Sequence, residues 1–210
     1  MTIREQKRPS DQDFESSQTA EELPPIVEKA LKMAQAKHEG QFRKTDTSMP
    51  FISHQIEVEE LVARFGGDDD TRAAALLHDI LEDTDYTPEE LEKDFGPQIA
   101  RIVQEVTEQE EKGPDPRDSW QPRKESYLRN LQDDSEPALL ICAADKIHNL
   151  SSLIREYQEQ GEALWEKFNA PKEKKLWYYG EVLKILQERL DNLIVRELAQ
   201  LYKKANEVFV

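Results

Sequence analysis

The sequence has 210 residues and a formal charge of −16, because 44 acidic residues outnumber 28 lysine and arginine residues. Such a charge argues against a nucleic acid polymer as the main partner and against an anionic membrane face, since both bind cationic surfaces. Cys142 is the sole cysteine, which excludes an intramolecular disulfide framework and a CxxC zinc site and fits a reducing cytosol.

The N-terminal part divides into a tail and the first helices. Residues 1–23 are polar and lack periodicity, so we expect a flexible tail, and they lack the apolar core of a signal peptide. The domain begins at Pro24 with a helix that runs to about Glu39. A loop at 41–53 leads to a second helix at 54–65, which ends at a Gly-Gly pair.

The middle of the chain is expected to hold the buried centre of the fold. Residues 71–83 (TRAAALLHDILED) are apolar around most of a helical circumference, which predicts one central buried helix. Thr87 and Glu90 have the spacing of a capping box, which predicts the start of a short helix. That helix should end near Gly96, and Pro97 should begin another.

The C-terminal half is predicted to be helical after a long loop. Residues 108–122 carry three prolines and one glycine among many charges, which is typical of such a loop. Further helices are expected over residues 123–131, 137–157 and 162–168 and, as one long C-terminal helix, from Pro171. We expect this last helix to pack internally or to form a homodimer contact.

No part of the sequence predicts a sheet, because no apolar–polar alternation is long enough. No uninterrupted stretch of 18 apolar residues predicts a membrane-spanning helix either. The expected fold class is therefore all-α, with a single domain over residues 24–210.

Four ionisable residues interrupt the apolar stretch 71–83. On a helix, His78 and Asp79 lie about one turn before Glu82 and Asp83, so the four side chains form one polar stripe. Like charges at this spacing repel one another even in water, and partial burial adds to the repulsion unless a cation is present. A divalent metal ion would resolve the conflict. The alternative is the solvated acidic face of a surface helix.

Two further residues complete a candidate ligand set. His54 starts a predicted helix, and Asp145 lies in a helix rich in small and apolar residues, where an unpaired carboxylate is unfavourable. Together with the adjacent His-Asp pair they supply two imidazoles and two carboxylates, which suit Mn, Fe, Co or Zn. Each has an ordinary alternative, because His54 could be a capping histidine and Asp145 could pair with Lys146 or Arg155.

These segments resemble the HD-domain metal-dependent phosphohydrolases, and within them the RelA/SpoT-type alarmone hydrolase domain and its small stand-alone relatives. The matching pieces occur in family order over about residues 25–155 and read AKHEGQFRK, MPFISHQIEV, AALLHDILEDT, FGPQIARIVQEVT and AADKIHNL. The resemblance implies an HD-domain helical bundle, in agreement with the all-α pattern.

The resemblance also implies roles for the residues in these pieces. The metal ligands, usually for Mn²⁺, would be His54, His78, Asp79 and Asp145. Glu82 and Asp83 match the acidic pair that positions and activates the attacking water. Arg43, Lys44 and Asn149 match residues that contact the substrate. Lys146 joins them as a further local cation, because a protein this acidic needs positive charge to bind a polyanion.

The remaining chemistry-bearing residues have more ordinary interpretations. His148 is expected to pack or to hydrogen-bond rather than to bind a metal. The aromatic residues near the C-terminus have a helical spacing that favours core packing over stacking on a purine, and these are Trp165, Phe168, Trp177, Tyr178 and Tyr179.

The leading hypothesis is a cytoplasmic, metal-dependent phosphohydrolase that acts on nucleotides. Its sharper form removes the 3′-pyrophosphate from guanosine-3′,5′-bis(diphosphate), and it follows from the resemblance. One alternative is a phosphatase of other nucleotides, such as NADPH or nucleoside phosphates. Another is a metal-bound sensor or scaffold without catalytic activity.

Overall fold

The computed structural model describes residues 22–43, 48–108 and 116–209. Within these ranges there is no strand beyond an isolated bridge between Phe42 and Pro50, so the all-α expectation is confirmed. The helices are α1 (Pro25–Lys37), α2 (Ile52–Arg64), α3 (Asp69–Leu77), α4 (Ile80–Asp83), α5 (Pro88–Val106), α6 (Pro116–Leu131), α7 (Glu136–Gln160), the 3-10 helix η1 (Gly161–Lys167), α8 (Lys172–Arg189) and α9 (Leu193–Val208).

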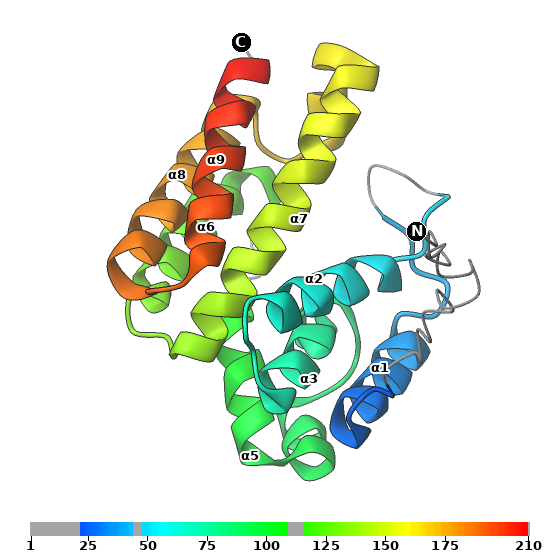
Figure 1. The fold of residues 1–210 in the computed structure, drawn as a ribbon. Coiled ribbons are helices and arrows are strands. Elements are labelled where there is room, and N and C mark those ends of the chain that lie inside the picture. Colours follow the sequence, from blue (N-terminus) through cyan, green and yellow to red (C-terminus); the bar gives the residue numbers. More distant parts are fainter. Residues whose placement is uncertain (1–21, 44–47, 109–115, 210) are drawn as a thin grey trace, which may run out of the picture.

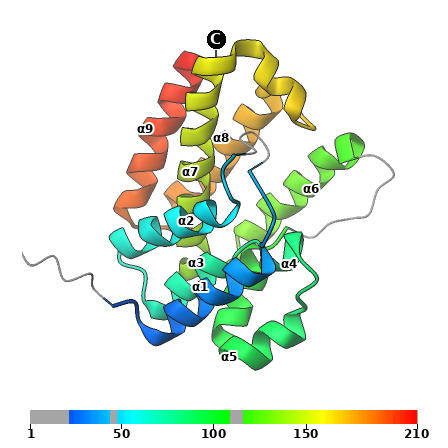
Figure 2. The same cartoon turned by 90° about the vertical axis from the view of Figure 1, so that its right-hand side faces the viewer.

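Helix α7 joins two groups of helices (Figures 1 and 2). On one part of its length it contacts α2, α3 and α5, and α1 packs against α3. On the other part it contacts η1, α8 and α9, and α6 packs against α8. The C-terminal helix α9 buries apolar side chains against this second group, so it packs internally, and the homodimer contact stays a prediction.

Helix α3 lies at the centre of the first group because its side chains are small or apolar. The side chains from Ala73 to Leu77 are 2% exposed or less, and the helix contacts α1, α2, α5 and α7. Asp68 starts it, since the Asp68 carboxylate accepts a hydrogen bond from the Thr71 backbone N–H at 2.8 Å. The expected central buried helix is therefore present.

The central helix is shorter than expected, because a break at His78 and Asp79 separates α3 from α4. The His78 ring donates a hydrogen bond through Nδ1 to the Ala75 carbonyl at 2.7 Å. A continuous helix would offer that carbonyl to the Asp79 N–H. Asp79 instead leads into α4, where its own carbonyl accepts from the Asp83 N–H at 3.0 Å. The prediction of one helix over 71–83 was wrong at this point.

Two other boundaries differ from the sequence-based expectations. Helix α6 begins at Pro116, so the predicted loop over 108–122 is too long; proline suits a first helical turn, and the Trp120 side chain is buried. The long helix expected from Pro171 is divided into α8 and α9. Asn192 makes the division, because its side chain accepts a hydrogen bond from the Ile194 N–H at 3.0 Å and caps α9.

The predicted signals around Gly96 are confirmed. Thr87 and Glu90 form the expected capping box at the start of α5. Gly96 has φ 83° and ψ 166°, a conformation that disfavours any other residue, and it kinks α5 where two helices were expected.

Two predictions fall on segments that the structure does not describe. Of the tail expected over residues 1–23, only residues 22 and 23 are described. Residues 109–115 of the predicted loop lie outside the described residues. In the described part of the chain, no helix combines the length and apolar character needed to cross a membrane.

Candidate metal centre

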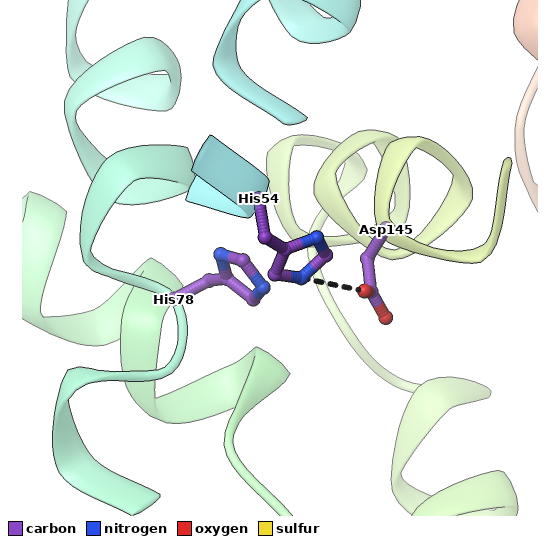
Figure 3. Close-up of side chains that lie close together, drawn as sticks. All are labelled: His54, His78 and Asp145. Carbon is purple, nitrogen blue, oxygen red and sulfur yellow. Dashed lines mark ion pairs between the residues drawn. The ribbon is translucent and has the colours of Figure 1, made fainter. Parts of the chain in front are cut away.

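Three separate elements meet at the break between α3 and α4. His54 comes from the first turn of α2, His78 from the end of α3, and Asp145 from the middle of α7. Their side chains point toward one another (Figure 3), and one potential ligand atom from each lies within 4.8 Å of the other two. Residues far apart in the sequence therefore form one compact cluster.

Asp79 joins this cluster from the same helix break. Its Oδ2 lies 3.2 Å from His78 Nε2 and 3.7 Å from His54 Nε2. His54 Nε2 in turn lies 3.2 Å from Asp145 Oδ1. The structure thus brings together all four side chains that the sequence analysis selected as ligands.

The charges within the cluster favour ionised carboxylates. Burial alone would raise the pKa of Asp145, but Lys146 and His54 outweigh it and hold that pKa well below its ordinary value. Burial likewise opposes ionisation of Asp79, yet the neighbouring His78 lowers its pKa. The cluster therefore presents two carboxylates able to bind a cation.

The two imidazoles differ in their affinity for a proton. Burial lowers the pKa of His54, with a contribution from the charge of His78. Burial also acts against a charge on His78, but Asp79 and Asp145 prevail and raise its pKa to about 9. A proton on His78 thus balances part of the negative charge of the two carboxylates.

The arrangement of donor atoms fits a divalent transition-metal ion. The His78 Nδ1–H is used by the Ala75 carbonyl, so Nε2 is the nitrogen that faces the cluster. This Nε2 is buried and, although Asp79 is near, makes no directed hydrogen bond. Two imidazole nitrogens and two carboxylates are donors that Mn, Fe, Co and Zn accept.

Glu82 lies beside the cluster at the cavity wall. The residue as a whole is exposed, but its carboxylate accepts a hydrogen bond from the Glu108 backbone N–H. Loss of hydration and the nearby charge of Asp79 raise the pKa of Glu82 to about 8. Asp83 differs, because it is exposed, does not line the cavity, and accepts a hydrogen bond from Gln41 through its backbone carbonyl.

A cavity of about 220 Å³ opens onto the cluster, and a second of about 280 Å³ adjoins it. Both share a polar wall that consists of Arg43, Lys124, Lys146, Asn149 and Tyr178. The second cavity adds aromatic side chains and another lysine, namely Phe51, Trp120, Phe168, Tyr179 and Lys175. The C-terminal aromatic residues therefore serve partly as core and partly as cavity wall.

Three of the predicted substrate residues lie together at the shared wall. Arg43 Nη2 donates a hydrogen bond to Asn149 Oδ1 at 3.1 Å, and the Asn149 amide donates to Asp145. Lys146 Nζ lies 2.5 Å from Asp145 Oδ2. Asp145 therefore forms the ion pair with Lys146 that the sequence analysis gave as an alternative, and it also contacts His54. Lys44 is outside the described residues.

Two residues near the centre were not selected from the sequence. Glu108 pairs with Lys124 and, at 3.2 Å, with Arg123, and its backbone holds Glu82. Glu108 stands in an acidic stretch of the sequence, which gave no indication that its side chain would be buried. His148 Nδ1 lies 2.7 Å from His54 Nδ1, which agrees with the expectation that His148 forms a hydrogen bond. The sequence did offer one indication, because His148 lies three residues after Asp145 on the same predicted helix.

Comparison with family models gives a match between residues 30–173 and the HD domain. This chain belongs to the HD-domain family. The matched range contains all four residues of the candidate metal centre and extends from α1 to the start of α8.

Named relatives of this HD-domain protein include hydrolases of guanosine-3′,5′-bis(diphosphate). The 3′-pyrophosphohydrolase MESH1 of Xenopus tropicalis is 36% identical over 135 residues, which is 62% of this chain and 70% of that protein. MESH1 of Drosophila melanogaster is 38% identical, over 59% of this chain and 66% of the relative. The Haemophilus influenzae 3′-pyrophosphohydrolase is 33% identical over 58% of this chain, but the match spans only 18% of that longer protein.

Two solved structures superpose on this chain. A metazoan ortholog of SpoT, described as hydrolysing ppGpp, superposes with a TM-score of 0.70 at 27% identity and covers 89% of this chain and 98% of its own. A Listeria monocytogenes protein superposes with a TM-score of 0.65 at 24% identity over 77% of this chain and 98% of its own, which bears on the fold alone.

Proposed function

We propose that this HD-domain protein is a metal-dependent phosphohydrolase that removes the 3′-pyrophosphate from guanosine-3′,5′-bis(diphosphate), leaving GDP and pyrophosphate. The observation that carries the proposal is a largely buried cluster of two histidines and two aspartates, which lines a cavity with a basic wall. Relatives that are 36% and 38% identical are named as enzymes of this reaction.

We propose His54, His78, Asp79 and Asp145 as ligands of one Mn²⁺ ion. The mixed nitrogen and oxygen donors support a divalent transition metal, and the family resemblance favours manganese. A bound divalent ion would lower the pKa of a water molecule and neutralise phosphate charge. The ion pair between Lys146 and Asp145 would orient that carboxylate toward the centre.

The proposed proton acceptor is Glu82, because its carboxylate lies at the cavity wall close to Asp79. Water attacks the phosphorus that is bonded to the ribose 3′ oxygen, in line with that P–O bond. The bond breaks, Glu82 accepts the proton of the water, and the 3′ oxygen takes a proton from solvent as GDP and pyrophosphate separate. The Glu108 N–H holds this carboxylate in place. Asp83 is proposed to position the water on the strength of the family motif alone, because its side chain does not line the cavity.

The substrate is proposed to span both cavities. Arg43, Lys146 and Asn149 line both spaces, so they can contact phosphate oxygens between the metal centre and the nucleoside. The aromatic wall of the larger space, including Phe168 and Tyr179, suits a purine base. Lys44 is proposed as a further phosphate contact because it adjoins Arg43 in the matching motif.

The cellular setting is part of the proposal. We place the protein in the cytoplasm, where nucleotides are available and its one cysteine, Cys142, stays reduced. We also propose a homodimer, which sedimentation velocity at micromolar concentration would test. A sedimentation coefficient of a monomer would contradict the dimer and leave the proposed reaction unaffected.

A substrate panel tests the proposed reaction. Purified, Mn²⁺-loaded protein is incubated with ppGpp, NADPH and deoxynucleoside monophosphates, and the released pyrophosphate and orthophosphate are measured separately. We expect pyrophosphate from ppGpp, with GDP as the second product. Orthophosphate release from the other nucleotides alone would contradict the proposed substrate, and no release from any compound would favour a sensor or scaffold.

A further inference from the structure

The His54 ring has polar contacts on both of its sides. On the side of the metal centre, Nε2 lies 3.2 Å from Asp145 Oδ1. On the opposite side, Nδ1 lies 2.7 Å from His148 Nδ1. His148 then reaches Glu57, whose Oε2 is 3.2 Å from His148 Nε2. These contacts form a continuous line from Asp145 through two imidazoles to Glu57.

The line is built from two helices with matching spacing. Helix α2 provides His54 and, three residues later, Glu57, while α7 provides Asp145 and, three residues later, His148. Residues three apart lie on one face of a helix, so each helix supplies one residue to the centre and one to its support. Both imidazoles are buried, whereas the Glu57 side chain is 55% exposed.

The short contact between the two histidines links their tautomers, so that a metal on one ring would determine the proton position on the other. Two ring nitrogens at hydrogen-bond distance share one hydrogen, so one donates and the other accepts. If His54 Nε2 binds a metal, its proton must be on Nδ1, and His148 Nδ1 must accept. The His148 proton is then on Nε2, where the Glu57 carboxylate accepts it.

We propose that His148 is a positioning residue, which holds His54 in the tautomer and ring orientation that present Nε2 to the metal, and that Glu57 orients His148 in the same way. The inference rests on the proposed metal centre and adds a supporting layer to it. In metal sites, partners of this kind change affinity by about 10- to 100-fold when they are removed.

A matched pair of substitutions tests this role. His148→Leu and His148→Asn both remove the ring and introduce side chains of similar size, but only asparagine keeps an acceptor for the His54 Nδ1–H. Binding is measured as the dissociation constant for Mn²⁺, from the paramagnetic resonance signal of the free ion. We expect His148→Leu to bind about 10- to 100-fold more weakly than the unaltered protein, and His148→Asn to retain most of the affinity.

Ser151→Ala is the control, because Ser151 follows His148 on α7, is exposed and lines the groove beside Glu57. It should leave the dissociation constant unchanged. Equal affinity of His148→Leu and the unaltered protein would overturn the inference, as would equal weakening by leucine and asparagine. Failure of the unaltered protein to bind Mn²⁺ would overturn both the proposed centre and this inference, so the two failures are distinguishable.

A second measurement needs no substitution. The protein has four histidines, so long-range proton–nitrogen NMR spectra of the diamagnetic Zn²⁺-loaded form can resolve each ring. We expect a neutral His148 with its proton on Nε2 and His54 with its proton on Nδ1. A His148 proton on Nδ1 would overturn the inference, because that nitrogen could not then accept from His54.

Discussion

His78 lies close to the negative charges of Asp79 and Asp145, and its protonation affects the binding of a cation at the centre. These carboxylates raise the pKa of His78 to about 9 against the opposing effect of burial, so a proton occupies the ring at neutral pH when no metal is bound. Coordination needs the neutral ring. Metal and proton therefore compete for the same Nε2.

This competition predicts the pH dependence of metal affinity. Below the raised pKa of His78 the proton must leave before Nε2 can bind, so the affinity for Mn²⁺ should rise as the pH rises. We expect about a tenfold gain per pH unit between pH 6.5 and 8.5, measured by competition with a chelator of known affinity. Constant affinity over this range, after correction for the chelator, would contradict the assignment of His78.

Glu82 is expected to act on the proton of the attacking water and not on the metal. Glu82→Gln keeps the size of the side chain and the acceptor for the Glu108 N–H but removes the base. We expect kcat for ppGpp to fall by about 10²- to 10⁴-fold, while the Mn²⁺ dissociation constant changes little. Asp83→Asn is the matched substitution at the neighbouring residue. An unchanged kcat in Glu82→Gln would exclude Glu82 as the proton acceptor.

At the scale of elements, two interruptions of helices place the site. The break between α3 and α4 carries His78 and Asp79, and the kink in α5 lies at Gly96. The kink was predictable because glycine followed by proline stops a helix. The break was not, because it depends on a side-chain hydrogen bond from His78 to the Ala75 carbonyl within an otherwise strong helical pattern.

The conformation of Gly96 gives a direct test of the kink. A Cβ atom there would meet nothing within 4 Å, so Gly96→Ala introduces backbone strain without a steric clash. Because φ is 83° and ψ is 166°, we expect the free energy of unfolding to decrease by about 1–3 kcal/mol. Urea denaturation measures it, with the exposed Glu92→Ala on the same helix as control. Equal stability of Gly96→Ala and the unaltered protein would show that the kink is not required.

The sequence predicted the candidate site better than it predicted several helix boundaries. Acids and histidines among apolar neighbours are conspicuous in a sequence, and the family motifs selected His54, His78, Asp79 and Asp145, which the structure brings together. Their role as metal ligands stays a prediction. The start of α6 was missed because charged residues around Pro116 resemble a loop. A hydrogen bond of His148 was expected, but its partner His54 was not, and neither was the contact of Glu108 with Glu82, since both arise between separate segments of the chain.

At the scale of the whole molecule, the candidate centre joins α2, the break between α3 and α4, and α7. These segments are distant in the sequence, and α7 also carries the second group of helices. An ion bound by all of them stabilises the folded chain, because the unfolded chain cannot present the same ligands together.

Metal binding should therefore raise the melting temperature. At a free Mn²⁺ concentration 100 times the dissociation constant, the expected stabilisation is about 2.7 kcal/mol, and a chelator should remove it. Differential scanning calorimetry measures the shift, and His54→Ala should show none. An equal shift in His54→Ala would indicate that the ion binds elsewhere.

Anomalous diffraction from a crystal grown with Mn²⁺ tests the central claim most directly. Data collected above and below the manganese absorption edge locate the ion without reference to any assumed ligand. The account predicts one strong peak within bonding distance of His54 Nε2, His78 Nε2, Asp79 and Asp145. A peak elsewhere in the molecule, or no peak at full manganese content, would contradict it.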